Sequence, residues 1–485
     1  MDGNRGGGFV RLDDCRWLIP RGTRPGMLTD GLIYAAEAML SAISEDRAHE
    51  QVANVACLPG IVGRSMAMPD IHWGYGFPIG GVAATDAATG VISPGGVGYD
   101  INCGIRILRT TLTEEEVRPH LRTLIEGIFR SVPAGVGGEG GLRLGRADLD
   151  AVLTDGASWA VEHGYGVPAD IPACEDGGRI AAADAGAVSN KAKQRGGNQL
   201  GTLGSGNHFL EVDVVDKIYD EAIARGFGIK PGMVTISIHV GSRGLGHQVC
   251  ADSLEVMAAA VKRYGIELPD RQLACAPVMS PEGRTYLAAM SAAANYAWAN
   301  RQVITGVVRR VVRETFARRP GDLDLSLLYD VAHNIAKLET HSWAGRPLKV
   351  CVHRKGATRA FPPGHPDVPA QYREFGQPVL VPGDMGRYSF ILAGTQTAME
   401  QTFGSTCHGA GRVMSRTAAK RGVSGEDIQR ELAAQGIMVK GQSRAGLAEE
   451  APAAYKDAQQ VVDVVDSAGI SRRVARLRPI GVIKG

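Results

Sequence analysis

The sequence of 485 residues contains no long hydrophobic run. No stretch approaches the ~20 uncharged apolar residues that span a bilayer, so we expect neither a membrane-spanning segment nor a membrane partner. Residues 1–11 are polar and rich in glycine, unlike a secretion signal. The eight cysteines are scattered without a Cys-x-x-Cys pair, which predicts reduced thiols and a cytoplasmic location.

The chain also lacks a large net charge and any internal repeat. Its formal charge is +2, so a nucleic-acid site would have to be a local patch. Apolar residues make up 44% and charged residues 21%, as in globular proteins, which excludes a disordered scaffold. The expected helices and strands are interleaved without a clean linker. We therefore interpret residues 1–485 as a single domain, with two domains as the alternative.

Glycine, in contrast, is abundant. The 64 glycines are roughly twice the average share, and several cluster beside histidine, aspartate or cysteine. Examples are Gly95-Gly96, Gly204–Gly206 and Gly409–Gly411. Because glycine allows a close backbone approach and positive φ, these clusters favour loops wrapped around a ligand. Simple tight turns are the alternative interpretation.

Periodicity predicts two helices and several short strands. Residues 113–130 combine a capping-box pattern, Thr113 with Glu116, with an apolar helical face. An alanine-rich helix is expected over 283–319, ended by Pro320-Gly321. Alternating strand-like runs end in polar residues and glycine turns, at 104–109, 233–239, 348–353 and 378–381. Polar strand ends of this kind are a common way to build a site on a rigid sheet.

Five side chains form a candidate metal site. Asp100 and Cys103 share one glycine-flanked loop, and this mixture of hard and soft ligands suits Mn, Zn, Fe or Co. His208 follows a glycine cluster, His239 ends an expected strand, and His333 lies at an expected helix start. Each histidine alone is better explained as a core residue, and the Asp100–Cys103 pair alone as a structural loop. Together the five form the inventory of a two-metal site in which one thiolate bridges.

Two further segments carry candidate chemistry. His408 is followed by a glycine turn and an expected helix with Arg412. A helix start attracts anions, so His408 suits a nucleophile toward phosphorus and Arg412 a group that neutralises charge. A general acid or base, or a helix cap, are the alternatives. The apolar run Pro479–Gly485 ends in Lys484, which would meet a phosphate or base if docked; a frayed end is the alternative.

Taken together, these segments resemble the RtcB family of RNA-splicing and RNA-repair ligases. The resemblance covers nearly the whole chain and is carried by the ordered motifs Met68–Gly81, Gly98–Gly104, Leu203–Glu211, Ile238–Gly244, Asp330–Asn334, Val352–Arg359, His408–Arg412 and Gly481–Gly485. It implies an α+β fold, with mixed strands and helices forming one large domain around a deep metal-containing cleft.

The resemblance also implies the roles of individual residues. Two Mn²⁺ ions would be bound by Asp100, Cys103, His208, His239 and His333, with Cys103 bridging, and His408 would receive GMP. The GTP site would be formed by Asn207, His208, Phe209, Leu210, Glu211, His333, Asn334, Pro382, Gly383, Asp384, Met385, Ser389, His408, Gly409, Ala410, Gly411, Tyr455 and Lys484. RNA contacts are assigned to Arg195, Gln199, Arg243 and Arg412.

The implied activity is GTP- and Mn-dependent ligation of RNA. A 3′-phosphate or 2′,3′-cyclic phosphate end would be joined to a 5′-hydroxyl end through a His408-GMP intermediate and an RNA-ppG end. The partner is RNA with these ends, and some relatives also need an activating helper protein. Two rival hypotheses are a dinuclear metal phosphoesterase, which would need no GTP, and a non-catalytic RNA-binding paralogue. The complete set of ligands and His408 argues against the second.

One position departs from the family pattern. Where the pattern resembles Pro-Gly-Ser-Met-Gly, this chain has Pro382-Gly-Asp384-Met-Gly386, followed by Arg387. A carboxylate would repel a triphosphate, whereas a carboxylate facing guanine N1 and N2 would accept hydrogen bonds. Nucleotide preference is therefore the property that Asp384 puts in question.

Overall fold

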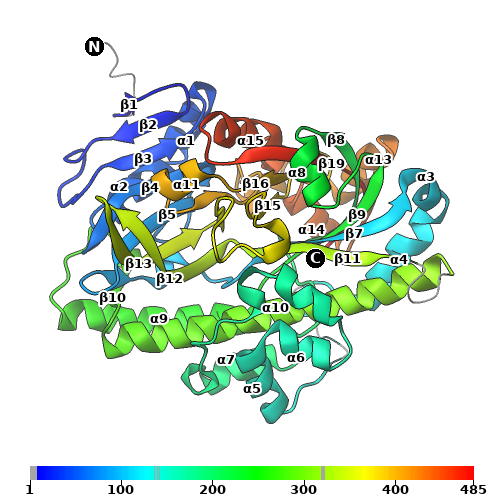
Figure 1. The fold of residues 1–485 in the computed structure, drawn as a ribbon, viewed down its shortest axis with the longest axis horizontal. Helices are drawn as coiled ribbons and strands as arrows, with labels where there is room; N and C mark the ends of the chain where they lie inside the picture. Colours follow the sequence, from blue (N-terminus) through cyan, green and yellow to red (C-terminus); the bar gives the residue numbers. More distant parts are fainter. Residues whose placement is uncertain (1–7, 136, 139, 141, 318–322) are drawn as a thin grey trace.

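The computed structural model describes residues 8–135, 137–138, 140, 142–317 and 323–485. Mixed helices and strands form one large domain built on two sheets (Figure 1). The first sheet has seven strands in the order β1 (Val10–Arg11), β2 (Arg16–Ile19), β3 (Gly31–Tyr34), β4 (Ile61–His72), β5 (Ile79–Asp86), β13 (Arg346–Lys355) and β12 (Asn334–Trp343). All neighbours in it are antiparallel except β3 and β4.

The second sheet carries most of the candidate site. Its order is β11 (Leu325–Ala332), β7 (Gly104–Thr113), β9 (Met233–Val240), β8 (Phe209–Ile218), β19 (Arg472–Lys484), β16 (Ser389–Ala393) and β15 (Pro378–Val381), and β18 (Met438–Gly441) pairs in parallel with β19. Every residue of β9 is buried, as expected for a central strand. Its register places His239 opposite Ile105 on one side and Phe209 on the other.

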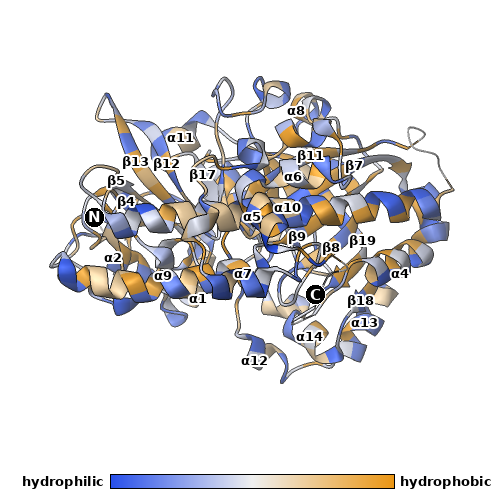
Figure 2. Cartoon of the chain, turned by 90° about the horizontal axis from the view of Figure 1, so that it is seen from below, coloured by the Kyte–Doolittle hydropathy of each residue, from blue (hydrophilic) through white to orange (hydrophobic). Residues whose placement is uncertain are grey.

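Two long helices lie side by side beneath the sheets (Figure 1). They are α9 (Arg243–Arg263) and α10 (Pro281–Thr315). The middle of α10 is rich in buried alanine, whose small side chain allows close packing. Hydrophobic and hydrophilic residues are interspersed along α9 (Figure 2), and its buried residues include Leu245, Val249 and Met257, as expected for a helix with one face on the core.

The remaining helices are short and surround the sheets. They are α1 (Leu40–Glu45), α2 (Ala48–Val55), α3 (Glu114–Val117), α4 (Leu121–Ser131), α5 (Arg146–Asp155), α6 (Ala157–Glu162), α7 (Asn190–Gly196), α8 (Glu221–Gly226), α11 (Gln396–Gln401), α12 (Arg416–Ala419), α13 (Gly425–Ala434), α14 (Arg444–Glu449) and α15 (Ala458–Ser467). Two small sheets pair β6 (Val91–Ile92) with β10 (Ala276–Pro277), and β14 (Ala357–Arg359) with β17 (Ser405–Cys407). Among the described helices, none has the combined length and apolar character that a bilayer crossing requires.

The helix expected over 113–130 is real but interrupted. The capping box of Thr113 and Glu116 is confirmed, and it begins α3. A 3-10 turn, Arg118–His120, then separates α3 from α4. Pro119 lies in this turn and cannot donate a backbone hydrogen bond, which explains the interruption.

The other expected elements are confirmed with adjusted ends. The alanine-rich helix begins at Pro281 rather than 283, because Ser280 caps it by accepting from the Gly283 N–H. It ends at Thr315, and the expected end at 319 and stop at Pro320-Gly321 lie outside the described residues. The four expected strands correspond to β7, β9, β13 and β15.

Candidate metal and nucleotide site

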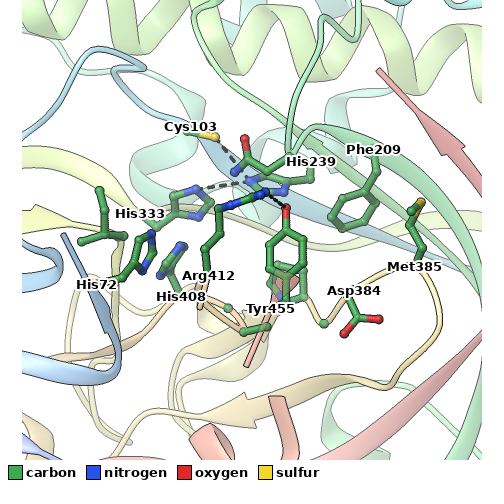
Figure 3. Close-up of a pocket in the computed structure, with 18 of the residues that line it drawn as sticks. His72, Cys103, Phe209, His239, His333, Asp384, Met385, His408, Arg412 and Tyr455 are labelled. Atoms are coloured by element: carbon green, nitrogen blue, oxygen red, sulfur yellow. Dashed lines mark hydrogen bonds between the residues drawn. The ribbon is translucent and has the colours of Figure 1, made fainter. Parts of the chain in front are cut away.

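The five predicted metal ligands lie together in two groups that share one thiol. Asp100, Cys103 and His208 form one group; Cys103, His239 and His333 form the other, with all ligand atoms of a group within 4.8 Å of one another. Cys103 Sγ is 3.5 Å from His208 Nε2 and 3.3 Å from His239 Nε2. Figure 3 shows His239 and His333 facing each other, with their Nε2 atoms 3.3 Å apart.

Sheet order explains why these residues meet. Asp100 and Cys103 lie in the loop before β7, and His208 directly precedes β8. His239 lies near the end of β9, between those two strands. His333 lies between β11 and β12, so the expected helix start at this residue is wrong. A connection between strands brings this imidazole to the same edge of the sheet.

A buried arginine holds the metal loop in place. Arg301 Nη1, from α10, donates to the carbonyl oxygens of Asn102 at 2.9 Å and Val240 at 2.8 Å. Its Nη2 also donates to Asp330 Oδ1 at 2.8 Å. Asn102 has φ of +50°, and this strained conformation turns the chain between the two loop ligands. The Asn334 side chain adds a donation to the Asp100 carbonyl at 3.1 Å.

The electrostatics of the site suit cations. Burial, and next the neighbouring imidazoles, lower the pKa values of His239 and His333 well below the usual range, which keeps their nitrogens neutral. Burial, followed by the charge of Asp100, raises the pKa of the Cys103 thiol. A bound divalent cation would reverse this effect by stabilising the thiolate. Neutral imidazoles, a carboxylate and one shared sulfur therefore fit a pair of divalent ions.

His408 lies beside this cluster and is fixed by a buried aspartate. Its Nδ1 is 2.6 Å from Asp70 Oδ2, which also accepts the backbone N–H groups of His408 at 2.9 Å and Gly409 at 3.2 Å. Its ring lies 4.9 Å from the His333 ring, centroid to centroid (Figure 3). Burial alone would raise the pKa of Asp70, but the His408 ring and these N–H groups lower it overall. The Nδ1 contact leaves Nε2 as the free nitrogen of His408.

The expected helix after His408 is wrong. His408 follows β17, and the next helix, α12, begins only at Arg416. Arg412 forms an isolated bridge with Tyr455 instead of a helical turn. The anion-binding argument from a helix start therefore does not apply. Asp70 replaces it as the group that orients His408, and sequence reasoning assigned Asp70 no role although it lies in the quoted motif Met68–Gly81.

A cavity of about 230 Å³ opens over His408 and the metal ligands. The predicted residues that line it are Asp100, Cys103, Asn207, Phe209, Glu211, His239, His333, Asn334, Pro382, Gly383, Asp384, Met385, His408, Gly409, Ala410, Gly411, Arg412, Tyr455 and Lys484. Leu210 does not line the cavity. It lies between Phe209 and Glu211 on β8, so its side chain points to the other face of the sheet, into a hydrophobic core. Ser389 does not line the cavity and instead accepts the Gly383 N–H at 3.0 Å, while His208 serves the metal group.

One carboxyl that lines the cavity is buried and has an unsatisfied oxygen. Glu211 is buried, and its Oε1 has no hydrogen-bond partner within the described part of the chain. Burial, and next Asp213, raise the pKa of Glu211 well above its usual range. Lys484 is docked and not frayed: it pairs with Phe209 across β19 and β8. Its Nζ lies 5.4 Å from the centre of the Phe209 ring.

A second buried acid, missed in the sequence, organises the rim. Glu450 accepts from Arg412 at 3.2 Å and from Arg416 at 3.3 Å, and it contacts the Tyr455 hydroxyl. The two arginines donate to Glu450 Oε1, whereas the Tyr455 hydroxyl contacts Oε2, which is also 3.6 Å from Lys484 Nζ. Arg412 also lies 4.9 Å over the Tyr455 ring (Figure 3). No motif marked Glu450, because its role arises from partners that are distant in sequence.

The unusual Asp384 is already paired. Its Oδ2 contacts Arg387 Nε at 2.5 Å, and its Oδ1 accepts the backbone N–H groups of Gly386 at 3.0 Å and Arg387 at 3.1 Å. Arg387 reaches further, to the carbonyl oxygens of Pro452 at 2.7 Å and Tyr455 at 2.9 Å. Arg387 therefore offsets the charge of Asp384 and ties this loop to the segment that carries Tyr455.

One of the four predicted RNA contacts lines the cavity, and the other three do not. Arg412 lines it, whereas Arg195, Gln199 and Arg243 lie by the first turn of α9. Gln199 Oε1 accepts the Gly244 N–H at 2.8 Å. Arg195 approaches so closely that a Cβ on Gly244 would lie 3.3 Å from its Nε. These three residues therefore form a polar cluster near the Asp100 side of the metal site.

Comparison with known proteins agrees with this geometry. A family model described as "tRNA-splicing ligase RtcB" matches residues 51–485. A protein named tRNA-splicing ligase RtcB from Archaeoglobus fulgidus is 56% identical over 482 residues, covering 99% of this chain and 100% of the relative. One from Thermococcus kodakarensis is 56% identical, covering 98% of each chain.

A bacterial relative shows a similar match. The RNA-splicing ligase RtcB of Mycobacterium tuberculosis is 55% identical over 438 residues, which is 90% of this chain and 100% of the relative. The similarity therefore extends over nearly the whole chain in archaeal and bacterial proteins alike. This chain belongs to the RtcB family.

Proposed function

We propose that the protein is a GTP- and manganese-dependent RNA ligase that joins RNA 3′-phosphate or 2′,3′-cyclic phosphate ends to 5′-hydroxyl ends. The observation that carries the proposal is the arrangement of His408. Asp70 holds Nδ1 at 2.6 Å, so the lone pair of Nε2 is free to attack phosphorus beside the metal cluster. Relatives named tRNA-splicing ligase or RNA-splicing ligase support RNA as the substrate.

In the proposed first step, His408 Nε2 attacks the α-phosphorus of GTP. A P–N bond forms, and the P–O bond to pyrophosphate breaks with its electron pair leaving on pyrophosphate. Asp70 accepts the hydrogen bond from Nδ1–H throughout and stabilises the positive charge that develops on the ring. Bound divalent ions would supply charge neutralisation at the phosphates.

Two transfers then complete ligation. An oxygen of the RNA 3′-phosphate attacks the phosphorus of His408-GMP, the P–N bond breaks, and an RNA-ppG end forms. The 5′-hydroxyl oxygen next attacks the RNA 3′-phosphorus, its proton passes to solvent water, and the P–O bond to GMP breaks with its electron pair leaving on GMP. A cyclic phosphate must first be opened by water. Arg412, held by Glu450 at 3.2 Å, is suited to neutralise phosphate charge on the rim.

A buried acceptor in the cavity supports GTP as the nucleotide. The orphaned Oε1 of Glu211 is a buried acceptor that guanine N–H groups would satisfy. Lys484 and Tyr455 add a cation and an aromatic ring to the same cavity. Asp384 is occupied by Arg387 and its own loop, so Glu211 is the better candidate for guanine recognition.

The proposed setting follows from the same residues. One catalytic domain over residues 1–485 would act on RNA in the cytoplasm. The eight unpaired cysteines support a reducing compartment.

Labelling without RNA tests the first step. We expect α-labelled GTP with Mn²⁺ to label the wild type covalently, with label that survives a denaturing gel and is lost in acid. His408→Ala should carry none. The matched control is His163→Ala, since His163 does not line the cavity, and this variant should label like the wild type. Absence of label on folded, metal-loaded wild type would exclude the ligase proposal and favour a dinuclear phosphoesterase.

A further inference from the structure

Three aromatic rings lie next to the metal loop and have no role in the chemistry above. The Tyr99 ring, directly before the metal ligand Asp100, stacks on the His247 ring with centroids 4.7 Å apart and an interplanar angle of 28°. The edge of the Tyr75 ring packs against Tyr99 at 5.5 Å and 68°. Tyr75 therefore supports Tyr99, and Tyr99 supports His247.

The stack ends at the surface. Tyr75 and Tyr99 are partly buried, whereas His247, on the second turn of α9, is exposed. Among the described residues no further ring packs on His247. An ordered stack whose last ring is open on one face can be extended by another flat ring.

The surroundings favour a nucleotide as that extension. The charge of Arg195 is close enough to His247 to lower its pKa, second only to the effect of burial. Arg195 is itself exposed, and Gln199 lies beside it against Gly244. A flat ring beside a guanidinium is the combination that binds single-stranded nucleic acid, with stacking for the base and charge for the phosphate.

We propose that the outer face of His247 stacks on a nucleobase of the RNA strand, within the first two nucleotides of a reacting end, while Arg195 contacts the adjoining phosphate. The inference rests on the proposed RNA-ligase function and names a strand-binding subsite for it. Proximity to the reacting end follows from the chain itself, because Tyr99 is bonded to Asp100. Since every base has a π-face, this contact would tolerate any sequence.

Binding of single-stranded RNA tests the stack directly. Two short RNA strands serve as probes, one with a 3′-phosphate end and one with a 5′-hydroxyl end. Each is also made with an abasic site at the first or the second nucleotide from that end. We expect one of the two intact strands to stack on His247. For that strand, His247→Ala should raise the Kd by at least about fivefold, which is the lower end of the range for base–aromatic stacking. His247→Phe keeps a flat ring and should bind within about twofold of wild type.

The abasic strands separate stacking from a general loss of structure. At the stacked position, removal of the base should weaken wild-type binding and erase the difference between wild type and His247→Ala. His163→Ala is the matched control, because His163 is also exposed and stacks on Trp159 at 4.1 Å and 20°, but it does not line the cavity. Its Kd should equal that of wild type.

Two outcomes would overturn the inference. In the first, His247→Ala binds both intact strands with the affinity of wild type. In the second, the variant binds more weakly than wild type on every abasic strand as well as on the intact strands. Covalent labelling by GTP is measured in parallel and reports on the proposed function separately. If wild type is not labelled but His247→Ala still weakens binding of intact RNA only, the ligase proposal fails and the stacking subsite stands. If labelling is normal and RNA affinity is unchanged, only the stacking inference fails.

Discussion

At the scale of single residues, the pairing of Asp384 with Arg387 decides what the departure from the family pattern does. The Asp384 side chain is 1% exposed, and burial raises the pKa of its carboxyl although Arg387 opposes this. Both oxygens accept bonds from its own loop. The carboxylate is therefore a structural part of the loop, so it would neither repel the triphosphate of the proposed GTP as a free charge nor be available to its guanine.

We predict that Asp384→Ser keeps His408 labelling within about tenfold of wild type, because a serine hydroxyl can still accept one loop N–H. Arg387→Ala should lower labelling more, by roughly tenfold or beyond, since it leaves a buried carboxylate without its cation and frees the Tyr455 segment. The double variant should lie between the two single variants, because it removes the unpaired carboxylate but still lacks the bonds from Arg387 to Pro452 and Tyr455. Labelling rates at several GTP concentrations measure all three. A loss of tenfold or more in Asp384→Ser would contradict this account.

The residues also show what the sequence could predict. The predicted metal ligands were accessible only as a set: each alone is better explained as a structural residue, but the five together, in the order of the family motifs, indicated one site, and all five meet. Asp70 and Glu450 were not, because a buried carboxylate is defined by partners far along the chain. His408 lies 338 positions from Asp70, and no local pattern records that contact.

At the scale of elements, α10 acts as a support for the metal loop. Arg301 connects this helix to Asn102 and Val240 on two separate segments, and it shares Asp330 with Arg106. The side chains of Arg301, Arg106 and Asp330 are fully buried. Removing Arg301 would leave Asp330 with one cation and two carbonyl groups without their donor.

We therefore expect Arg301→Met to destabilise the metal-free protein by about 3–5 kcal/mol, the usual cost of breaking a buried ion pair, and to weaken Mn²⁺ binding. Arg310→Met is the matched control on the same helix, because Arg310 is exposed; it should lie within about 0.5 kcal/mol of wild type. Chemical unfolding without metal and calorimetric titration with Mn²⁺ measure the two effects. If the two variants had the same free energy of unfolding and the same affinity for Mn²⁺, Arg301 on α10 would not support the site.

Helices and strands were predicted well where the periodicity of the sequence determines them, and poorly where the connections between elements determine the course of the chain. The alternation of β9 and the capping box of α3 are local, so both were accessible. The expected helix starts at His333 and after His408 were wrong. His333 is the single residue between β11 and β12, and the glycine-rich segment after His408 runs from β17 to α12. In both places strand pairing with distant segments, not a local pattern, fixes the course of the chain.

At the scale of the whole molecule, the candidate metal site joins segments that are far apart in the chain. Its ligands come from the loop before β7, the start of β8, the end of β9 and the β11–β12 connection. Ions bound there would stabilise the folded state as a unit, by roughly 2.7 kcal/mol per site at a free concentration 100 times Kd. Mn²⁺ should therefore raise the unfolding temperature, and a chelator should reverse the rise.

The shared thiol makes this prediction specific. Cys103 belongs to both ligand groups, whereas His208 belongs to only one. We expect two ions per wild-type chain by elemental analysis, one for His208→Ala, and fewer than one for Cys103→Ala, with the rise in unfolding temperature declining in the same order. Cys351→Ala provides the control for loss of a buried thiol outside both groups, and it should keep two ions. If His208→Ala and Cys103→Ala lost the same number of ions, Cys103 would not bridge, and the two groups would have to be treated as one site.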